Sequence, residues 1–313
     1  MKKILVTGGA GNVGGSLVEA LLKDQDKYVV VVDNLITGSL EKIPFMHLNN
    51  FKFIKADVNN YDEIAAIMLS YQFDYVFHYA ALVGVKRTLE NPIKVLDDIQ
   101  GIKNILTLSK NTGVLRVFYS SSSEVYGEPV EYPQNEHTTP LNSRLPYAIV
   151  KNVGEAFLKS FHKEYGLNYT IFRFFNTYGP RQSEDFVVSK FMQAAMKNED
   201  ITIYGDGSQT RTFCFIDDNL DVTLKCLNEG HCVNDVMNIG NDKEVTVLNL
   251  ASKIIEITKS SSKIIHLPPL QEGDMTRRMP DTTKVKIILG RELIKLEDGL
   301  SIIFNSWRDS MKS

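Results

Sequence analysis

The sequence predicts an α/β protein built on a doubly wound, Rossmann-type parallel sheet, with a smaller α/β domain toward the C-terminus. Three observations predict this fold class. Short β-branched runs alternate with helical stretches, as in successive βαβ units. The runs are almost continuously apolar, which is typical of strands covered by helices on both faces. A glycine-rich turn, TGGAGNVG, joins the first run to the first helical stretch.

The length and net charge of the chain indicate how many domains it forms and which partners it excludes. The chain has 313 residues, which is enough for two domains of ordinary size. We predict the doubly wound domain at 1–176 and a second domain at 177–313, with some segments of the second returning to the first. Lys and Arg number 35 and Asp and Glu number 38, a net charge of −3 that argues against a nucleic-acid-binding protein.

Cysteine usage and hydropathy bear on the compartment. The 3 cysteines lack metal-ligand spacing, which indicates a reducing environment rather than a disulfide framework. No apolar run approaches the ~20 residues that span a bilayer, and the apolar run near the start is too short for a signal peptide. We expect a cytoplasmic protein with no membrane partner.

The alternation of runs and helical stretches predicts each element in order. Strands are expected at 2–8, 28–33, 51–57, 75–80, 116–122 and 169–176, and helices at 12–23, 62–69, 92–109 and 147–165. Beyond these the pattern loosens to a turn-rich loop at 205–210, a strand at 236–241, a helix at 246–257 and a break in regular structure at 267–270. We expect this second part to cap the carboxyl edge of the sheet, where ligands of open α/β sheets bind.

The glycine turn is the first candidate site. Gly8, Gly11 and Gly14 follow a strand and open a helix, so the backbone can approach a pyrophosphate whose charge meets the helix N-terminus. Asp33 ends the second strand about 20 residues on, where a carboxylate accepts hydrogen bonds from ribose hydroxyls. A carboxylate there repels a 2′-phosphate, which favours NAD over NADP. Asp57, which ends the third strand, is a further candidate for contact with the adenine.

A second candidate site combines Ser122, Tyr147 and Lys151. Tyr147 and Lys151 lie one turn apart on a predicted helix and so share a face. A neighbouring ammonium stabilises a phenolate, so Lys151 is expected to lower the pKa of Tyr147 and let it act as a base near neutral pH. Ser122 ends the preceding strand, and its hydroxyl is placed to pass a proton between a substrate and Tyr147.

These residues resemble the extended short-chain dehydrogenase/reductases that act on nucleotide sugars. The resemblance covers essentially the whole chain. Its motifs include TGGAGNVG, FHYAAL (77–82), SSSEVYG (121–127), YAIVK (147–151), FFNTYGPRQ (174–182), YGDGSQTRTF (204–213) and RMPD (278–281). It implies a nucleotide-sugar substrate and a homodimer that pairs the helices near 92–110 and 147–165 into a four-helix bundle.

The resemblance also implies roles for single residues. Tyr147 is expected to be the general base, Lys151 to bind the nicotinamide ribose, and Ser122 to bond the sugar 4-hydroxyl. The cofactor-binding residues that it implies are Gly8, Gly11, Asn12, Val13, Gly14, Asp33, Asn34, Asp57, Val58, Tyr79, Ala80, Ala81, Tyr147 and Lys151. The substrate-binding residues that it implies are Ser122, Ser123, Asn176, Arg211 and Arg278, and guanidinium forks such as the last two pair well with a diphosphate.

A few positions depart from the pattern of these relatives. Asn12 and Val13 replace a common aromatic–isoleucine pair in the glycine turn, and Thr212 replaces a frequent Asp after Arg211. Asp98 stands where relatives usually have Asn near the cofactor, so no cofactor contact is assigned to it.

The sequence leaves the reaction open within this family. All members begin by oxidising C4 of the sugar, with Tyr147 taking the 4-hydroxyl proton while hydride passes to NAD. Glu124 resembles the carboxylate of dehydratases and UDP-glucuronate decarboxylases, where UDP-galactose 4-epimerases usually have a small residue. The loops at 33–38 and 80–92 instead resemble those of epimerases, and Lys86 and Arg87 on the second loop are expected to be solvated charges.

We therefore expect a 4-epimerase that acts through a transient 4-keto sugar. The alternative is a UDP-glucuronate decarboxylase or a 4,6-dehydratase in which Glu124 is a further catalytic residue. A catalytically idle NAD-binding regulator is the remaining alternative, and it would be expected to lack Tyr147, Lys151 or Ser122.

Overall fold

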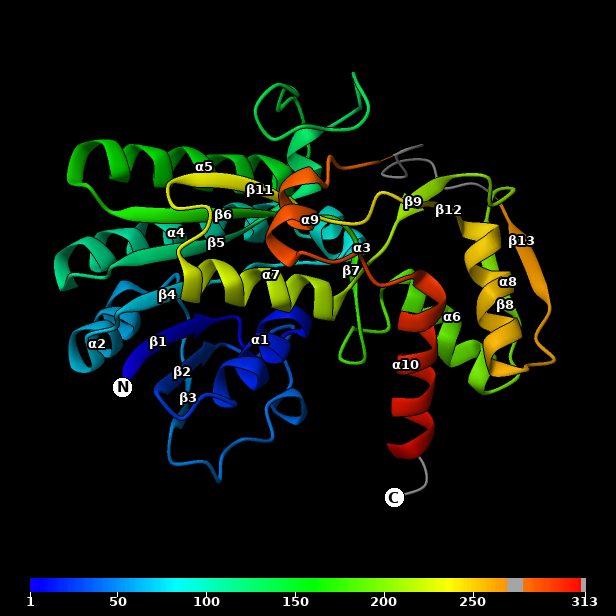
Figure 1. The fold of residues 1–313 in the computed structure, drawn as a ribbon, viewed down its shortest axis with the longest axis horizontal. Helices are drawn as coiled ribbons and strands as arrows, with labels where there is room; N and C mark the ends of the chain where they lie inside the picture. The colour runs from blue at the N-terminus through cyan, green and yellow to red at the C-terminus, as the bar shows by residue number, and fades with distance from the viewer. Residues whose placement is uncertain (269–277, 311–313) are drawn as a thin grey trace.

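A seven-stranded parallel sheet forms the centre of the molecule in the computed structural model, which describes residues 1–268 and 278–310 (Figure 1). The strand order is β11-β6-β5-β4-β1-β2-β3, and every neighbouring pair is parallel. The predicted Rossmann-type α/β fold is therefore confirmed.

The sheet strands and the four helices predicted beside them lie close to their predicted positions. The strands are β1 (Lys2–Thr7), β2 (Lys27–Asp33), β3 (Phe51–Lys55), β4 (Tyr75–His78), β5 (Arg116–Ser122), β6 (Asn168–Phe174) and β11 (Asp235–Ile239). The helices are α1 (Asn12–Leu22), α2 (Tyr61–Tyr71), α3 (Val85–Glu90), α4 (Pro92–Thr112), α5 (Pro146–Tyr165), α7 (Ile216–Glu229) and α9 (Thr283–Leu289). Strands β1, β3, β4 and β6 end one or two residues before the predicted limits, because the chain leaves the sheet there to form the loops of the candidate site.

Helices cover both faces of this sheet, as the continuous apolar strands require. Val29 to Val32 are all buried, with alternate side chains packed into different cores. One core joins the sheet to α2, α4 and α5, and the other joins it to α1, α7 and α9. The strands are thus removed from water on both sides, and only their ends are available to ligands.

In its described residues, the second lobe consists of helices and three two-stranded sheets. Its strands are β7 (Thr177–Tyr178), β8 (Ile201–Tyr204), β9 (Thr210–Thr212), β10 (Cys214–Phe215), β12 (Glu244–Thr246) and β13 (Ile264–Leu267). Its helices are α6 (Val187–Met196), α8 (Val247–Thr258) and α10 (Leu296–Ser310), which share a third core. Two short 3-10 helices, η1 (Leu40–Lys42) and η2 (Ser123–Tyr126), lie in the first lobe.

The two lobes exchange chain segments after residue 176. Strand β11 pairs with β6 at the edge of the main sheet, and α7 and α9 pack on that sheet. The division at residue 176 stays a prediction, with β11, α7 and α9 as the segments that return. Helices α3, α6, α7, α9 and α10 were not predicted from the sequence. Residues 269 and 270 of the predicted break at 267–270 lie outside the described residues.

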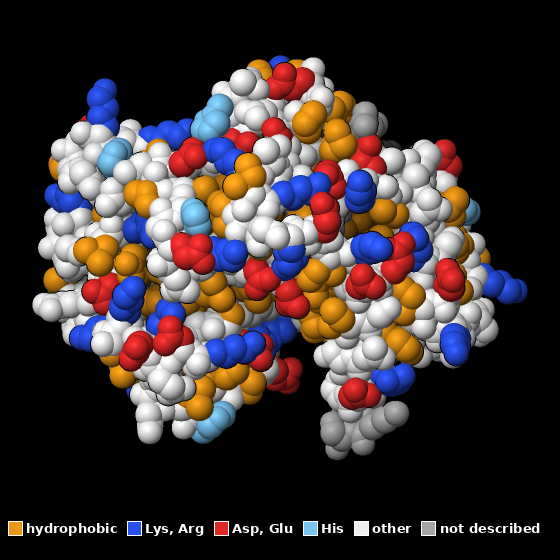
Figure 2. All heavy atoms as spheres, viewed as in Figure 1, with side chains coloured by type: hydrophobic (Ala, Val, Ile, Leu, Met, Phe, Trp, Pro, Cys, Tyr) orange, Lys and Arg blue, Asp and Glu red, His pale blue; other side chains and the backbone are white. Residues whose placement is uncertain are grey.

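The surface carries charges of both signs. Figure 2 shows lysine, arginine, aspartate and glutamate side chains interspersed over the face that also carries α7 and α9. Ion pairs also form at the surface, as between Arg291 and Asp221 and between Lys286 and Asp242. Pairs of this kind that remain in contact with water contribute little to stability.

One ion pair lies deep inside the first lobe. Arg173 on β6 and Glu155 on α5 are each 1% exposed. The Arg173 Nε and Nη2 donate to the two carboxylate oxygens of Glu155 at 2.8 and 2.7 Å, and Nη1 donates to the Tyr126 hydroxyl and the Glu136 carbonyl. Ser121 on β5 donates a further hydrogen bond of 2.6 Å to Glu155. This network joins β5, β6, α5 and η2 in the interior.

Removing one charge of this pair leaves the other buried without compensation. We expect Glu155→Gln to lower the free energy of unfolding by about 3–5 kcal/mol, measured by urea titration. The matched control is Glu297→Gln, which removes an exposed carboxylate paired with Lys253 and is expected to cost less than about 1 kcal/mol. Equal losses for the two variants would contradict a structural role for the buried pair.

Candidate active site

The glycine turn after β1 has the geometry of a phosphate cradle. Gly8 has φ +70°, and a Cβ there would lie 2.6 Å from the Ala80 nitrogen. A Cβ on Gly14 would lie 2.3 Å from the Gly8 carbonyl oxygen. Gly11 is the N-cap of α1 and offers no capping side chain, so the first N–H groups of the helix are left for an anion. A side chain at Gly8 or Gly14 would clash with the backbone of the turn or of the neighbouring segment, so the turn requires glycine there.

The ends of β2 and β3 bring the adenosine candidates together. The Asp33 carboxylate is 8% exposed and accepts hydrogen bonds from the N–H groups of Ala10 (3.0 Å) and Leu35 (2.8 Å). It is thereby fixed beside the glycine turn. The Asn34 side chain donates to Asp57 over 3.2 Å, which joins the two strand ends. Val58, next to Asp57, is buried.

The segment after β4 forms the opposite wall of the cradle. Ala80 N–H donates to the Thr7 hydroxyl (3.3 Å), and Ala80 and Ala81 are half-buried. The Tyr79 ring packs edge-on against Phe77 and Phe174 in the core. The side chain of Tyr79 therefore packs in the core. Only the backbone of Tyr79 is left for the predicted contact with the cofactor.

Ser122, Tyr147 and Lys151 meet at the carboxyl end of β5, as predicted. Ser122 is the last residue of β5, and Tyr147 and Lys151 lie on the first two turns of α5. A hydrogen bond links Ser122 with Tyr147. Lys151 is 3% exposed, and its Nζ donates to the Ser120 hydroxyl at 3.3 Å and lies 5.7 Å from the centroid of the Tyr147 ring.

Burial sets the protonation of this group. It raises the pKa of Tyr147, and the Glu124 charge raises it further, while the Ser122 hydrogen bond lowers it. The pKa of Tyr147 therefore lies above its ordinary value, opposite to the direction expected from Lys151. Burial also lowers the pKa of Lys151 to about 8, against an opposing effect of Asp98. Desolvation outweighs the attraction between neighbours in this site.

Glu124 and Arg278 form a bidentate ion pair at the edge of this group. Both guanidinium Nη atoms donate to the carboxylate, each at 2.6 Å, and Arg278 Nη1 lies 3.4 Å from the Ser123 hydroxyl. The Arg278 and Glu124 charges both act on the pKa of Tyr147. The arginine predicted to bind a diphosphate is thus bound to the predicted catalytic carboxylate.

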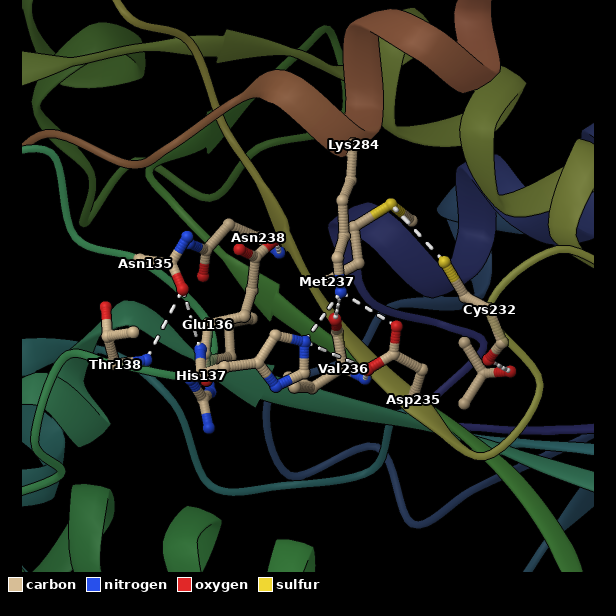
Figure 3. Close-up of polar contacts among 12 residues, drawn as sticks. Asn135, Glu136, His137, Thr138, Cys232, Asp235, Val236, Met237, Asn238 and Lys284 are labelled. Carbon is tan, nitrogen blue, oxygen red and sulfur yellow. Dashed lines mark hydrogen bonds and ion pairs between the residues drawn. The ribbon is translucent and has the colours of Figure 1, made fainter.

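The segment that carries Arg278 is anchored to the loop between η2 and α5. Gln134 N–H donates to the Met279 carbonyl and Asp281 N–H donates to the Gln134 carbonyl, both at 2.8 Å. The Asn238 side chain on β11 also donates to the Gln134 carbonyl. Figure 3 shows Lys284 of α9 reaching the Asp235 carboxylate and the Val236 carbonyl beside His137. These contacts fix α9, and with it Arg278, against the end of the sheet.

Asn176 and Arg211 lie farther along the path between the lobes. Asn176 has φ +36° and donates from its side chain to the Thr212 carbonyl at 3.0 Å. Arg211 is on β9, paired in register with Val245 of β12, and its Nη1 donates to the Thr210 carbonyl. Their predicted contact with a diphosphate stays a prediction. Arg87, expected to be solvated, pairs with Asp185 at 3.1 Å, and the Lys86 side chain lies outside the described residues.

Two further polar residues of the site were not predicted. Ser120 receives the Lys151 hydrogen bond, and Asp98 on α4 contributes to the charge around Lys151. The signal for Ser120 was present, because residues two apart on a strand share a face and Ser122 was already assigned. The only signal for Asp98 in the sequence was that it replaces the asparagine that is usual in relatives.

Comparison with known proteins places the chain in a family. The sequence pattern of the NAD dependent epimerase/dehydratase family matches residues 4–240, which contain the glycine turn, Ser122, Tyr147 and Lys151. The chain belongs to this family. A zebrafish protein named UDP-glucuronic acid decarboxylase 1 is 36% identical over 96% of this chain and 71% of its own length. An Arabidopsis thaliana protein, UDP-glucuronic acid decarboxylase 4, is also 36% identical, over 98% of this chain and 68% of its own.

Solved structures of this family have the same fold. The UDP-glucose 4-epimerase of Thermotoga maritima, solved with UDP-glucose, has a TM-score of 0.91 and 34% identity, and covers 99% of both chains. The UDP-glucuronic acid 4-epimerase of Bacillus cereus, solved with UDP-glucuronic acid and NAD, has a TM-score of 0.89 and 29% identity, over 98% of this chain and 99% of that one. NAD is the cofactor of this epimerase/dehydratase family, as the sequence predicted. Across the described residues, no helix has the length and apolar character needed to cross a bilayer.

The position of Asp33 predicts the selectivity between cofactors. We expect the protein to bind NADH about 10- to 100-fold more tightly than NADPH, because a 2′-phosphate would oppose the fixed Asp33 carboxylate. Fluorescence titration of the reduced cofactors measures both affinities. Asp33→Ser is expected to narrow the difference, and equal affinity of the unaltered protein for the two cofactors would contradict the assignment.

Proposed function

We propose that this chain is an NAD-dependent nucleotide-sugar enzyme that oxidises C4 of a UDP-linked uronic acid and removes its carboxylate. The observation that carries the proposal is the Glu124–Arg278 ion pair beside Tyr147. A reaction confined to C4 does not require the Glu124 carboxylate for its chemistry. The curated relatives named decarboxylases, similar over nearly the whole chain, support the same choice.

The first step uses Tyr147, Ser122 and Lys151. Tyr147 takes the proton of the 4-hydroxyl through its hydrogen-bonded neighbour Ser122. The Lys151 ammonium, held by Ser120, favours the phenolate. Bound NAD supplies the acceptor for the C4 hydride and returns that hydride at the end of the cycle. The product of this step is a ketone at C4.

The second step follows from the chemistry of that ketone. A C4 ketone is β to the C6 carboxylate, so the C5–C6 bond can break with release of carbon dioxide, and its electron pair forms an enolate. The enolate takes a proton at C5 to give a 4-keto pentose. The Arg278 fork offers two donors to a carboxylate or to the developing enolate, and Glu124 is placed to hold the proton that C5 receives.

4-Epimerisation is the second candidate function. The loops at 33–38 and 80–92 resemble those of epimerases, and the similarity to solved 4-epimerases, 34% identical in one case, also supports it. In that reaction the 4-keto sugar turns over and takes hydride on its other face, and Glu124 only holds Arg278. We place decarboxylation first because it gives the Glu124 carboxylate a part in the chemistry, whereas in epimerisation this carboxylate only holds Arg278. Ser122, Tyr147 and Lys151 all lie together, which disfavours an idle regulator.

Product mass separates these reactions. The protein is incubated with NAD and UDP-glucuronic acid, UDP-glucose or dTDP-glucose, and the products are analysed by mass spectrometry. We expect a UDP-pentose, lighter than UDP-glucuronic acid by carbon dioxide. An isomer of unchanged mass would favour the epimerase instead, and loss of water would favour a dehydratase. A product lighter only by water, or unchanged in mass, would exclude decarboxylation.

Two substitutions separate the steps within the cycle. Glu124→Ala is expected to lower turnover about 10²-fold or more while NADH still forms, because only the chemistry beyond C4 uses the carboxylate. Tyr147→Phe is the matched control, and it is expected to lower NADH formation itself by about 10²-fold. Absorbance of NADH in single-turnover experiments measures both. A Glu124→Ala enzyme with full turnover would contradict a chemical role for this carboxylate.

We also propose that two copies associate through α4 and α5. These helices pack side by side on one face of the sheet (Figure 1). Their outer surfaces expose apolar side chains that include Ile93, at 71%, and Leu96 on α4, and Ile149 on α5. Two such pairs of helices would bury these side chains in a four-helix bundle, as the family resemblance implies.

Sedimentation velocity tests the association. We expect a dimer for the unaltered protein and dissociation on Ile93→Lys, which places a charge in the apolar contact. Ile287→Lys is the control, since Ile287 on α9 is equally exposed, at 74%, and lies away from α4 and α5. A monomeric unaltered protein, or equal behaviour of both variants, would overturn this assignment.

A further inference from the structure

Asp98 ties together two loops that border the site. Its Oδ2 accepts a hydrogen bond of 2.8 Å from the Leu82 N–H, in the segment after β4. Its Oδ1 lies 3.5 Å from the Asn59 side-chain nitrogen, in the segment after β3. Ala80, Ala81 and Val58 of the predicted cofactor set belong to these same segments. No step derived above uses the Asp98 carboxylate.

Lys151 is a buried cation whose direct contacts are neutral. Its Nζ donates to the Ser120 hydroxyl, and it lies 5.1 Å from the centroid of the Tyr119 ring and 5.7 Å from that of Tyr147. An ammonium removed from water needs a compensating charge to stay protonated. Asp98, on the neighbouring helix α4, is the charge that raises the pKa of Lys151 against its burial.

We propose that Asp98 is a positioning residue that acts through Lys151: its carboxylate keeps the buried ammonium charged and at the same time holds the Leu82 segment against the cofactor site. A neutral asparagine offers the same hydrogen-bonding oxygen to Leu82 but no charge. The inference rests on the C4 oxidation of the proposed function, which decarboxylation and epimerisation share. It does not depend on which of the two follows.

Other groups around the pair do not replace Asp98. His78 on β4 faces Lys151, and burial lowers its pKa to about 3, so it is uncharged at neutral pH. Glu155 on α5 is already paired with Arg173. Burial raises the pKa of Asp98 and Asp57, after β3, raises it further, while Glu124 and Arg278 act on the pKa of Tyr147 with opposite signs. The charged and titratable groups around the site are thus Asp57, His78, Asp98, Tyr119, Glu124, Tyr147, Lys151, Glu155 and Arg278.

Loss of the Asp98 charge changes the pKa of both Lys151 and Tyr147. Removing the negative charge of Asp98 lets the pKa of Lys151 fall further below about 8, so its ammonium is lost at lower pH. Asp98 also raises the pKa of Tyr147, so the phenolate forms at lower pH when the charge is gone. Both limbs of a pH profile should therefore move toward acid. If Asp98 acted only through the Leu82 hydrogen bond, its substitution would change the affinity or rate by the same factor at every pH, without shifting either limb of the pH profile.

The test compares Asp98→Asn with Asp97→Asn, a change of the exposed neighbouring carboxylate. The first measurement is the affinity for NADH against pH, from neutral pH upward, which needs no sugar. At about pH 9 we expect Asp98→Asn to bind NADH roughly threefold or more weakly than the unaltered protein, with a smaller difference at neutral pH. The second measurement is the rate of NADH formation against pH, with the sugar nucleotide that reacts. Both limbs of this pH profile should shift toward acid.

A second variant separates charge from folding. Asp98→Glu keeps the carboxylate. The limbs of its pH profile should therefore stay at the pH values of the unaltered protein, even if its affinity for NADH is lower at every pH. Circular dichroism confirms that each variant is folded. A profile of Asp98→Asn that coincides with that of Asp97→Asn would overturn the proposal, as would an acid shift in Asp98→Glu equal to that in Asp98→Asn. Because NADH binding is measured without sugar, these outcomes remain distinct from a failure of the proposed reaction.

Discussion

The buried guanidinium of Arg173 is the constraint on which the site depends. It lies inside the first lobe at 1% exposure and donates to Glu155 on α5, to Tyr126 on η2 and to the loop carrying Glu136. A charge in such a place is stable only with good geometry from every partner. The partners therefore cannot shift independently. Because α5 carries Tyr147 and Lys151, and η2 carries Glu124, one interior charge fixes the relative positions of the residues proposed to act on substrate.

The Glu124–Arg278 pair extends this rigid frame to a segment far along the chain. Arg278 precedes α9, and the backbone that follows it, at Met279 and Asp281, is held by Gln134 in the loop that begins at η2. Asn238 joins the two, since it bonds both the Gln134 carbonyl and the Tyr126 hydroxyl that Arg173 also contacts. The polar network thus runs without interruption from the interior pair to the site. A substrate anion that binds Arg278 must compete with the Glu124 carboxylate, so the proposed chemistry and substrate entry involve the same two side chains.

The sequence could predict what local pattern and spacing determine. Continuous apolar strands, the glycine turn and Asp33 follow from rules that act within about 30 residues, and Tyr147 and Lys151 share a helix face. The sequence could not predict pairings between distant segments. Arg278 and Glu124 are 154 positions apart, and nothing in either motif indicates that a phosphate-type arginine is bound to a carboxylate. Helices α6, α7, α9 and α10 were missed because the interpretation of the second lobe relied on turns and breaks. The direction of the Tyr147 pKa was missed because burial cannot be read from a four-residue spacing.

The site combines burial with few charges, and this decides how it can work. Removal from water raises the pKa of Tyr147 and lowers that of Lys151, so each is pushed toward its neutral form. The phenolate of Tyr147, which is the form that can take a proton, is then available near neutral pH only if nearby positive charge opposes desolvation. Arg278 supplies such a charge and lowers the pKa of Tyr147, whereas the Glu124 and Asp98 carboxylates raise that pKa further. Asp98 acts on the cation nearest the predicted cofactor, and Glu124 on the cation nearest the predicted substrate. Each carboxylate therefore has one cationic neighbour and also raises the pKa of Tyr147, so burial and the two carboxylates together favour the protonated tyrosine against Arg278.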